Sequence, residues 1–132
     1  MIKEAYCSYE VSKLLKEKGF NEATNRYYNA QYDEIRTISD TFMTYWNNEE
    51  HMKVLMMEGA LAIPTHQMAT AWLRTKHIII VVQPEYFNAD GICSYWGVDI
   101  WADDNYEKLQ GDFPTYEEAV EASLKYSLEN LI

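Results

Sequence analysis

The strongest constraint on the fold is a run of five β-branched residues, from Ile78 to Val82. The run is long enough for a β-strand and too short for a helix. Because every position is apolar, both faces of this strand need cover, and we expect it to lie in the centre of a sheet. Pro84 follows closely and is expected to mark a bulge or the end of the strand.

A turn and further strands are expected after this run. Residues 88–91 read NADG, and Asp and Gly tolerate the positive φ angles that a tight hairpin demands. The return strand is expected at about 92–102, followed by a turn at 103–105 and a third strand near 106–110. Alternation along the return strand predicts two faces. The core face comprises Ile92, Trp96, Val98 and Ile100, and the opposite face comprises Cys93, Tyr95, Gly97, Asp99 and Trp101.

Two helices are predicted after Pro-Thr pairs. One covers about 66–76, where apolar residues recur at helical spacing. The other runs from about 115 to 131, and Thr115 and Glu118 have the spacing of a capping box at its start. We expect both helices to pack on the same sheet. The predicted shared core contains Trp72, Ile80, Trp96, Val98, Leu124 and Leu128.

The N-terminal half has a less regular pattern. A helix is expected at about 9–19, between a capping serine and a terminating glycine. Residues 26–38 combine tyrosines and isoleucines with turn-forming asparagine, which fits a short hairpin or a strand followed by irregular chain. The segment 39–63 stays open between helix and strand, with a strand near 60–63 slightly favoured.

The order of these elements predicts an α+β fold. We expect a single domain over residues 1–132, with an antiparallel sheet and helices packed mainly on one face. A chain of this length can bury one core without cross-links, and Cys7 and Cys93 are expected to be free thiols. No apolar run approaches the roughly 18–20 residues that span a bilayer, so a soluble, cytoplasmic protein is expected.

The net charge of −10 is concentrated in the last third of the chain. Residues 1–84 hold 10 acidic and 9 basic side chains, whereas residues 85–132 hold 11 acidic side chains and only Lys108 and Lys125 as bases. Such a field repels nucleic acid and anionic membranes, so neither is expected as a direct partner. It favours a basic protein partner, and an acidic surface that only increases solubility is the alternative.

Aromatic side chains accompany this acidic segment. On the off-core face of the predicted strand 92–102, Tyr95 and Trp101 flank Asp99, and Tyr and Trp are enriched in interface hot spots. The alternative is that these rings pack beneath a loop or in a homodimer. The predicted protein-binding residues are Tyr95, Asp99, Trp101, Asp103, Asp104, Glu107, Glu117, Glu118 and Glu121.

Motifs for catalysis, metal binding or nucleotide binding are absent from the sequence. His51, His66 and His77 lack the spacing that places two ligands on one helical face. Neither cysteine is flanked in the sequence by an obvious oxyanion hole. The five glycines are scattered singly, so they form no glycine-rich loop for nucleotide phosphates. We therefore predict no catalytic residue, no metal site and no cofactor.

Three stretches of the chain resemble a known family. They are IPTHQMATAWLRTKH at 63–77, FPTYEEAVEASLKYSLENLI at 113–132 and KLLKEKGFNEA at 13–23. The family consists of small uncharacterised proteins found in prophages and mobile elements of Bacteroides-like bacteria. The resemblance implies a cytoplasmic accessory protein of phage or mobile-element origin, and it transfers no catalytic residue.

Three functions stay open at this point. The favoured one is a non-enzymatic binding protein that engages a basic host or phage protein through its acidic C-terminal third. The second is a homo-oligomeric structural accessory protein, and the third is a small enzyme with an unrecognised site.

Overall fold

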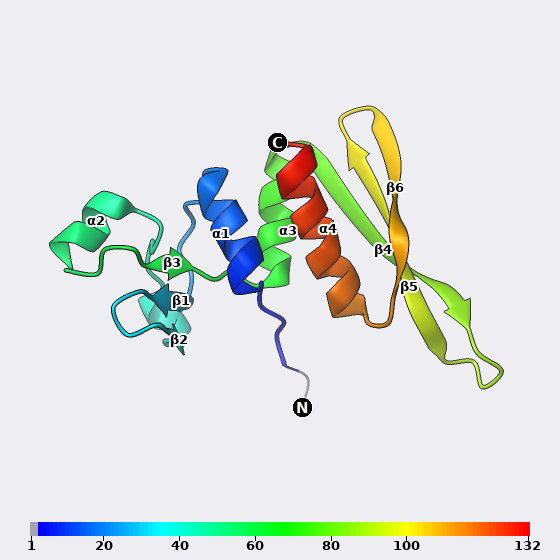
Figure 1. Cartoon of the computed structure of the whole chain (residues 1–132), viewed down its shortest axis with the longest axis horizontal. Helices are drawn as coiled ribbons and strands as arrows, with labels where there is room; N and C mark the ends of the chain where they lie inside the picture. Colours follow the sequence, from blue (N-terminus) through cyan, green and yellow to red (C-terminus); the bar gives the residue numbers. More distant parts are fainter. Residues whose placement is uncertain (1–2) are drawn as a thin grey trace. The chain divides into compact units, whose positions relative to one another are not determined.

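The computed structural model describes residues 3–132 of the chain. In this part it contains four α-helices, one short 3-10 helix and six strands, and the strands form two three-stranded antiparallel sheets (Figure 1). The chain divides into two compact units, Met1–Gln67 and Met68–Ile132, and each unit contains one sheet. The predicted α+β class is confirmed. The strands are divided between two sheets, where one sheet was expected, because the strands before Pro64 pair only with one another.

The N-terminal unit builds its sheet around a hairpin. β1 is the central strand and pairs with β2 on one side and with β3 on the other, so the hairpin alternative for residues 26–38 and the strand near 60–63 are both confirmed. The segment that sequence reasoning left open also contains two short helices. The elements are α1 (Tyr9–Glu17), β1 (Arg26–Asn29), β2 (Glu34–Thr37), η1 (Asp40–Phe42), α2 (Glu49–Val54) and β3 (Leu61–Ala62).

Local capping explains why α1 forms where the sequence predicts it. The Ser8 hydroxyl accepts a hydrogen bond from the Val11 backbone N–H at 3.1 Å, which satisfies one of the free amides of the first turn. After the helix, Gly19 has φ +99°, a conformation that L side chains rarely adopt. Both ends of the helix are therefore determined by residues next to them.

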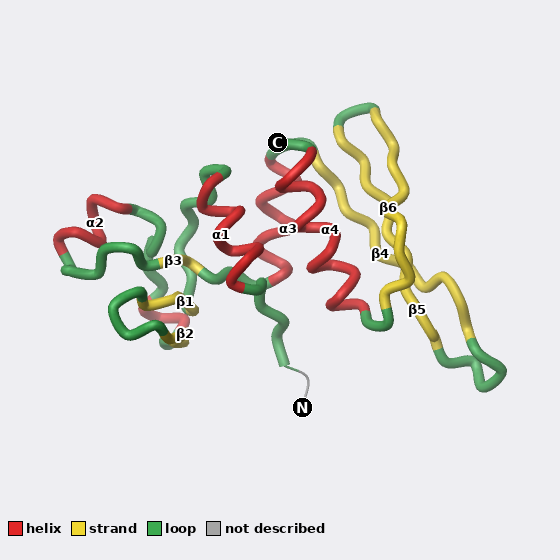
Figure 2. The backbone as a smooth tube through the Cα atoms, in the orientation of Figure 1, coloured by secondary structure: helices red, strands yellow, loops and turns green. Residues whose placement is uncertain are grey.

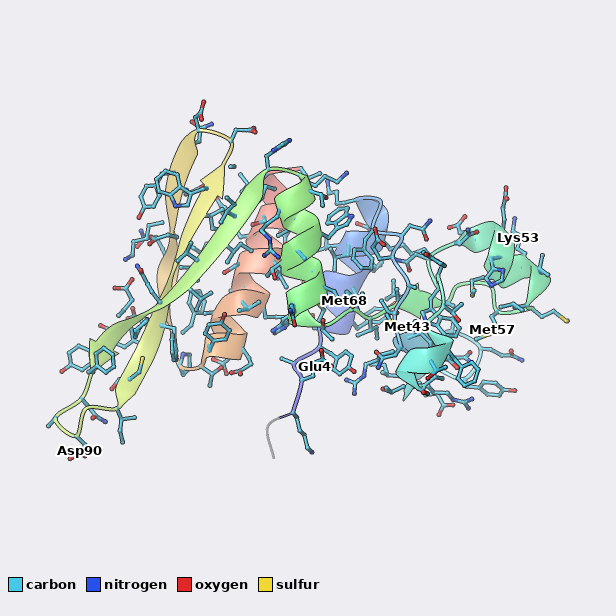
Figure 3. The ribbon with its side chains drawn as sticks, turned by 180° about the vertical axis from the view of Figure 1, so that it is seen from behind. Glu4, Met43, Lys53, Met57, Met68 and Asp90 are labelled. Atoms are coloured by element: carbon cyan, nitrogen blue, oxygen red, sulfur yellow. The ribbon has the colours of Figure 1, made fainter. Side chains whose placement is uncertain are left out.

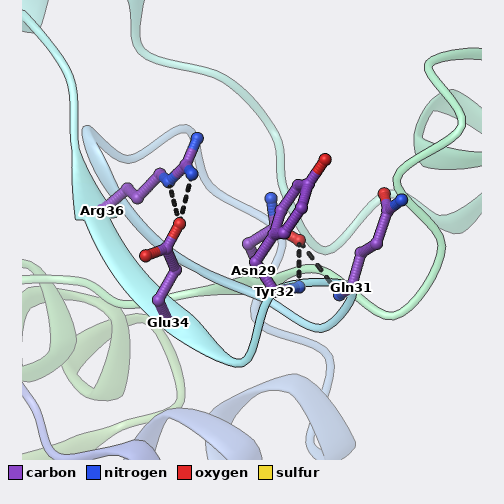
Figure 4. A network of polar contacts seen from close by, with 5 residues as sticks. All are labelled: Asn29, Gln31, Tyr32, Glu34 and Arg36. Atoms are coloured by element: carbon purple, nitrogen blue, oxygen red, sulfur yellow. Dashed lines mark hydrogen bonds and ion pairs between the residues drawn. The ribbon is translucent and has the colours of Figure 1, made fainter.

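The β1–β2 turn has its own set of polar contacts (Figure 4). The Asn29 Oδ1 atom accepts hydrogen bonds from the backbone N–H groups of Gln31, at 3.0 Å, and Tyr32, at 3.4 Å. Arg36 forms an ion pair with Glu34 on the exposed strand β2. The turn is thus held by an asparagine that replaces backbone acceptors.

Trp46 and Asn47 anchor the segment that the sequence left open. The buried Trp46 ring stacks on Tyr27 of β1, with ring centroids 3.8 Å apart. The Asn47 side chain donates to the Phe20 carbonyl at 2.8 Å and accepts from the Ala62 N–H at 2.9 Å. These contacts join parts of the chain that are up to 27 residues apart, which no local pattern could indicate.

The C-terminal unit is a three-stranded meander with α4 packed against all three strands (Figure 2). Its strand order is β4-β5-β6, and both pairings are antiparallel. The first two residues of α3 belong to the other unit. The elements are α3 (His66–Thr75), β4 (Ile78–Phe87), β5 (Cys93–Ala102), β6 (Asn105–Phe113) and α4 (Tyr116–Asn130).

The predicted helical stripe of α4 is buried as expected, from Ala119 to Leu128. One of the two hydrogen bonds of the predicted capping box is present: the Thr115 hydroxyl accepts from the Glu118 backbone N–H at 3.1 Å. Among the six predicted core residues, two are partly exposed, Ile80 and Trp96. The buried ones are Trp72, Val98, Leu124 and Leu128. Of the two helices expected on this sheet, α4 packs against all three strands and α3 does not.

The hairpin between β4 and β5 forms at the predicted turn. The Asn88 Oδ1 atom accepts hydrogen bonds from the N–H groups of Asp90 and Ile92, and Gly91 has φ +76°. Asp90 lies at the tip of this hairpin (Figure 3). The pairing register shifts between Pro84 and Tyr86, so the predicted bulge is confirmed.

Two expectations about this sheet are wrong. The Ile78–Val82 run was expected in the centre, but β4 lies at an edge, because in a meander of three consecutive strands the middle strand is the second one. Ile79 and Val81 are also exposed, because they lie on the face of the sheet that α4 does not cover. Ile92 was assigned to the core, but it precedes β5 in the turn and is exposed as well.

Candidate binding surface on the open sheet face

One face of the β4–β5–β6 sheet is turned away from α4, and we call it the open face. Val98 and Ile100 of β5 are buried, so the alternating residues Asp99 and Trp101 point to the opposite side. The pairing register then assigns the neighbours on β4 and β6 to this side. The open face comprises Ile79, Val81, Gln83, Tyr86, Tyr95, Gly97, Asp99, Trp101, Tyr106 and Lys108. Glu85, which lies in the bulge and has no partner in the register, also belongs to it, because its carboxylate lies over Gly97 and pairs with Lys108.

An apolar strip crosses one end of the open face. Trp101 of β5 lies opposite Ile79 of β4 and Tyr106 of β6. The Trp101 and Tyr106 rings are in contact, with centroids 4.8 Å apart. Ile79, Val81, Trp101 and Tyr106 are 49%, 40%, 43% and 52% exposed. Four neighbouring apolar side chains thus remain in contact with solvent.

The carboxylate of Asp99 lies beside this strip and is held by two neutral donors. Its Oδ2 atom accepts from the Gln83 side-chain amide at 2.9 Å, and its Oδ1 atom accepts from the Tyr106 hydroxyl at 2.6 Å. The hydrogen bond to Asp99, followed by desolvation and the Asp99 charge, raises the pKa of Tyr106 above its ordinary value. Tyr106 is therefore a donor at neutral pH, and its hydroxyl orients the Asp99 carboxyl group on the surface.

An ion pair crosses the central strand next to Asp99. The Lys108 Nζ atom of β6 lies 2.6 Å from Glu85 Oε1 of β4, and the hydrogen bond to Glu85 raises the pKa of Lys108. The pair spans β5 directly over Gly97, where an added Cβ would lie 2.0 Å from the Glu85 carboxylate oxygen. The missing side chain of Gly97 is what lets Glu85 reach Lys108.

A second aromatic pair lies on the open face beyond this ion pair. The register shift after Pro84 brings Tyr86 opposite Tyr95, and their rings stack with centroids 5.6 Å apart. Between Tyr95 and Lys108 the surface has a hollow of about 180 Å³ that is lined mainly by polar groups. The open face thus alternates aromatic and charged groups along the sheet.

The structure brings only three of the predicted binding residues together on this face: Tyr95, Asp99 and Trp101. Glu107 belongs to the opposite face, where it accepts a hydrogen bond from the Tyr126 hydroxyl of α4, and this bond raises the pKa of Tyr126. Glu121 is half-buried on α4.

The remaining predicted acidic residues lie at two ends of the unit. Asp103 and Asp104 occupy the exposed β5–β6 turn, whereas Glu117 and Glu118 lie in the first turn of α4. All nine residues of β6, about 30 Å of extended chain, separate the two pairs. Glu117 and Glu118 also have a structural role, since acidic groups stabilise a helix N-terminus. The acidic residues of the last third therefore do not form one continuous field.

Sequence reasoning missed most of the open face. The residues it omitted are Ile79, Val81, Gln83, Glu85, Tyr86, Tyr106 and Lys108. Only one signal pointed to the ion pair: a glycine inside a predicted strand, Gly97, is typical of a close approach by another group. The partners across the strand depend on the pairing register, which the sequence does not show.

The N-terminal unit has another hollow, of about 200 Å³, near Trp46 and Met52. Lys16 lines it and donates to the Ala60 carbonyl at 3.2 Å. Neither Cys7 nor Cys93 forms a disulfide in the described part of the chain, in agreement with the prediction. Within residues 3–132, none of the helices is both long enough and apolar enough to cross a membrane.

A scan of protein-family models finds no match to this chain, and searches of curated proteins and of solved structures find no match either.

Proposed function

We propose that this chain is a non-enzymatic binding protein that engages a basic protein through the open face. The observation that carries the proposal is the exposed apolar strip formed by Ile79, Val81, Trp101 and Tyr106, directly beside the oriented carboxylate of Asp99. Contiguous exposed apolar surface next to polar groups is typical of protein-binding sites.

The chemistry of the strip favours a cationic side chain from the partner, Arg above all. A guanidinium can lie over the Trp101 and Tyr106 rings and donate to Asp99 at the same time. Tyr and Trp contribute large contact area at low entropic cost, and here they stand on paired strands, which limits the cost of ordering them further.

The charge of the unit supports the same choice of partner. Residues 68–132 hold 11 acidic side chains and 4 basic ones, and Lys108 on the open face is already paired with Glu85. Although the acidic groups are spread over the unit, their summed field attracts a cationic partner and steers its approach. Association is therefore expected to slow as salt increases.

The proposal includes the biological setting that the family resemblance implies. In this setting the chain acts in the cytoplasm as an accessory protein of a prophage or mobile element, and its basic partner is a host or phage protein.

The test compares three baits in the same bacterial lysate: the natural chain, Trp101→Ala with Asp99→Asn, and the control Glu129→Gln. Glu129 is exposed on α4 and its replacement also removes one charge, away from the open face. Captured proteins are quantified by mass spectrometry, and a candidate is then purified for calorimetry at two salt concentrations.

We expect a basic protein that binds the natural chain and the Glu129→Gln control equally and loses at least about tenfold in affinity with the double variant. Circular dichroism checks that the variants are folded. If every captured protein binds all three baits equally, or if the partner is acidic, the proposal is wrong.

A further inference from the structure

β4 is an edge strand without the usual protection against pairing. Within residues 3–132 it has a neighbouring strand on one side only, β5. From Ile78 to Gln83 it carries no charged residue. Its aliphatic side chains are accessible on both faces of the sheet, since Ile79 and Val81 are exposed and Ile80 and Val82 are only half-buried.

Such an edge is unusual, because its backbone N–H and C=O groups offer a template for another strand. Proteins normally protect edges with charges, prolines or bulges. In β4 the proline and the bulge lie at Pro84–Tyr86, beyond the aliphatic run, so they protect only the far half of the strand. The other edge strand of this sheet, β6, carries the charges of Glu107, Lys108 and Asp112.

We infer that β4 pairs with β4 of a second copy of this chain, in antiparallel orientation, and joins the two sheets into one of six strands. In this two-fold arrangement one residue of the run lies opposite its own copy, and each row of side chains continues into the same row of the partner. Ile79 and Val81 then extend the partner's open face, while Ile80 and Val82 meet on the other side.

Two features of the strand favour a second copy as the occupant. A strand that fits this edge has to be aliphatic on both faces, and β4 itself has that composition. In addition, two copies each carrying −10 repel one another except where uncharged surfaces meet, and the Ile78–Gln83 edge is such a surface. Pairing through β6 would instead bring Glu107 and Asp112 close to the acidic groups of the second copy.

This dimer does not rest on the proposed function. Pairing uses the backbone edge of β4, whereas the proposed partner binds side chains on the open face. Two of these side chains, Ile79 and Val81, are on β4, and the rings of Trp101 and Tyr106 are on the other two strands. The dimer would place two open faces side by side in one continuous surface.

The first test measures mass by sedimentation equilibrium over a wide range of protein concentrations. The natural chain is compared with Val81→Lys, which places like charges close together at the paired edges, and with Tyr106→Lys, which introduces the same charge on the same face at the opposite edge strand. Both native side chains are exposed, so folding is expected to survive.

We expect a reversible dimer for the natural chain, a dissociation constant raised at least about tenfold by Val81→Lys, and little change with Tyr106→Lys. A natural chain that is monomeric throughout overturns the inference. A dimer that Tyr106→Lys disrupts and Val81→Lys does not would be a face-to-face dimer, which also overturns it.

The second test does not depend on weakening the dimer. In a Cys93→Ser background, single cysteines are introduced one at a time at Ile79, Ile80, Val81 and Val82, and the variants are oxidised mildly. Opposed residues of antiparallel strands have Cα atoms about 4.5–5.5 Å apart, within disulfide range. We expect covalent dimers from the position at the two-fold axis and few from its neighbours. Equal yields at all four positions, or none, contradict the pairing.

Discussion

Replacing Leu124 with alanine tests the packing of α4 on the β4–β5–β6 sheet. Leu124 is completely buried in the middle of the α4 stripe, and α4 packs against all three strands. The change removes three carbon atoms, which corresponds to about 2.4 kcal/mol of lost transfer free energy at about 0.8 kcal/mol per CH₂ group. The cavity that remains adds about 1–2 kcal/mol. We expect a loss of about 3.4–4.4 kcal/mol in the free energy of unfolding.

Urea unfolding followed by circular dichroism and tryptophan fluorescence measures this loss. Three of the four tryptophans, including Trp96 beside Tyr116 of α4, lie in the C-terminal unit, so fluorescence reports largely on this packing. Glu129→Ala on the exposed side of α4 is the control and should stay within about 0.5 kcal/mol of the natural chain. A Leu124→Ala midpoint that matches this control would show that α4 does not dock through its stripe.

Three further changes test local features of the C-terminal unit. Thr115→Ala removes the acceptor for the Glu118 N–H and should cost about 1 kcal/mol in urea unfolding. Gly97→Ala introduces a Cβ that displaces Glu85 and breaks its ion pair with Lys108. The raised pKa of Lys108 should therefore fall towards its ordinary value in an NMR titration. The hydrogen bond to Asp99 raises the pKa of Tyr106 in the folded protein. The stability that this bond contributes is therefore complete below pH 10, the ordinary pKa of tyrosine, and is lost as pH rises through the folded-state pKa. Tyr106→Phe should remove one late-titrating tyrosine from the ultraviolet titration.

Sequence reasoning predicted the candidate surface only in part. Tyr95, Asp99 and Trp101 were recognised because alternation along a single strand separates its two faces. The acidic groups were expected to act together because they are close in sequence. In the structure, Asp103 and Asp104 are separated from Glu117 and Glu118 by the length of β6, since an extended strand moves its two ends far apart.

Short-range features were determined by the sequence itself. Ser8 and Thr115 begin their helices, and the NADG turn closes its hairpin, through hydrogen bonds between residues two to four positions apart. Such contacts form wherever the local chain allows them, so a pattern of a few residues predicts them. The tertiary structure alone decided that the aliphatic run lies at a sheet edge. It also decided that Glu85 and Lys108, which are 23 positions apart in sequence, meet over Gly97. Strand order and register depend on pairing between distant segments, and the same aliphatic run fits a central or an edge strand equally well until its neighbours are in place.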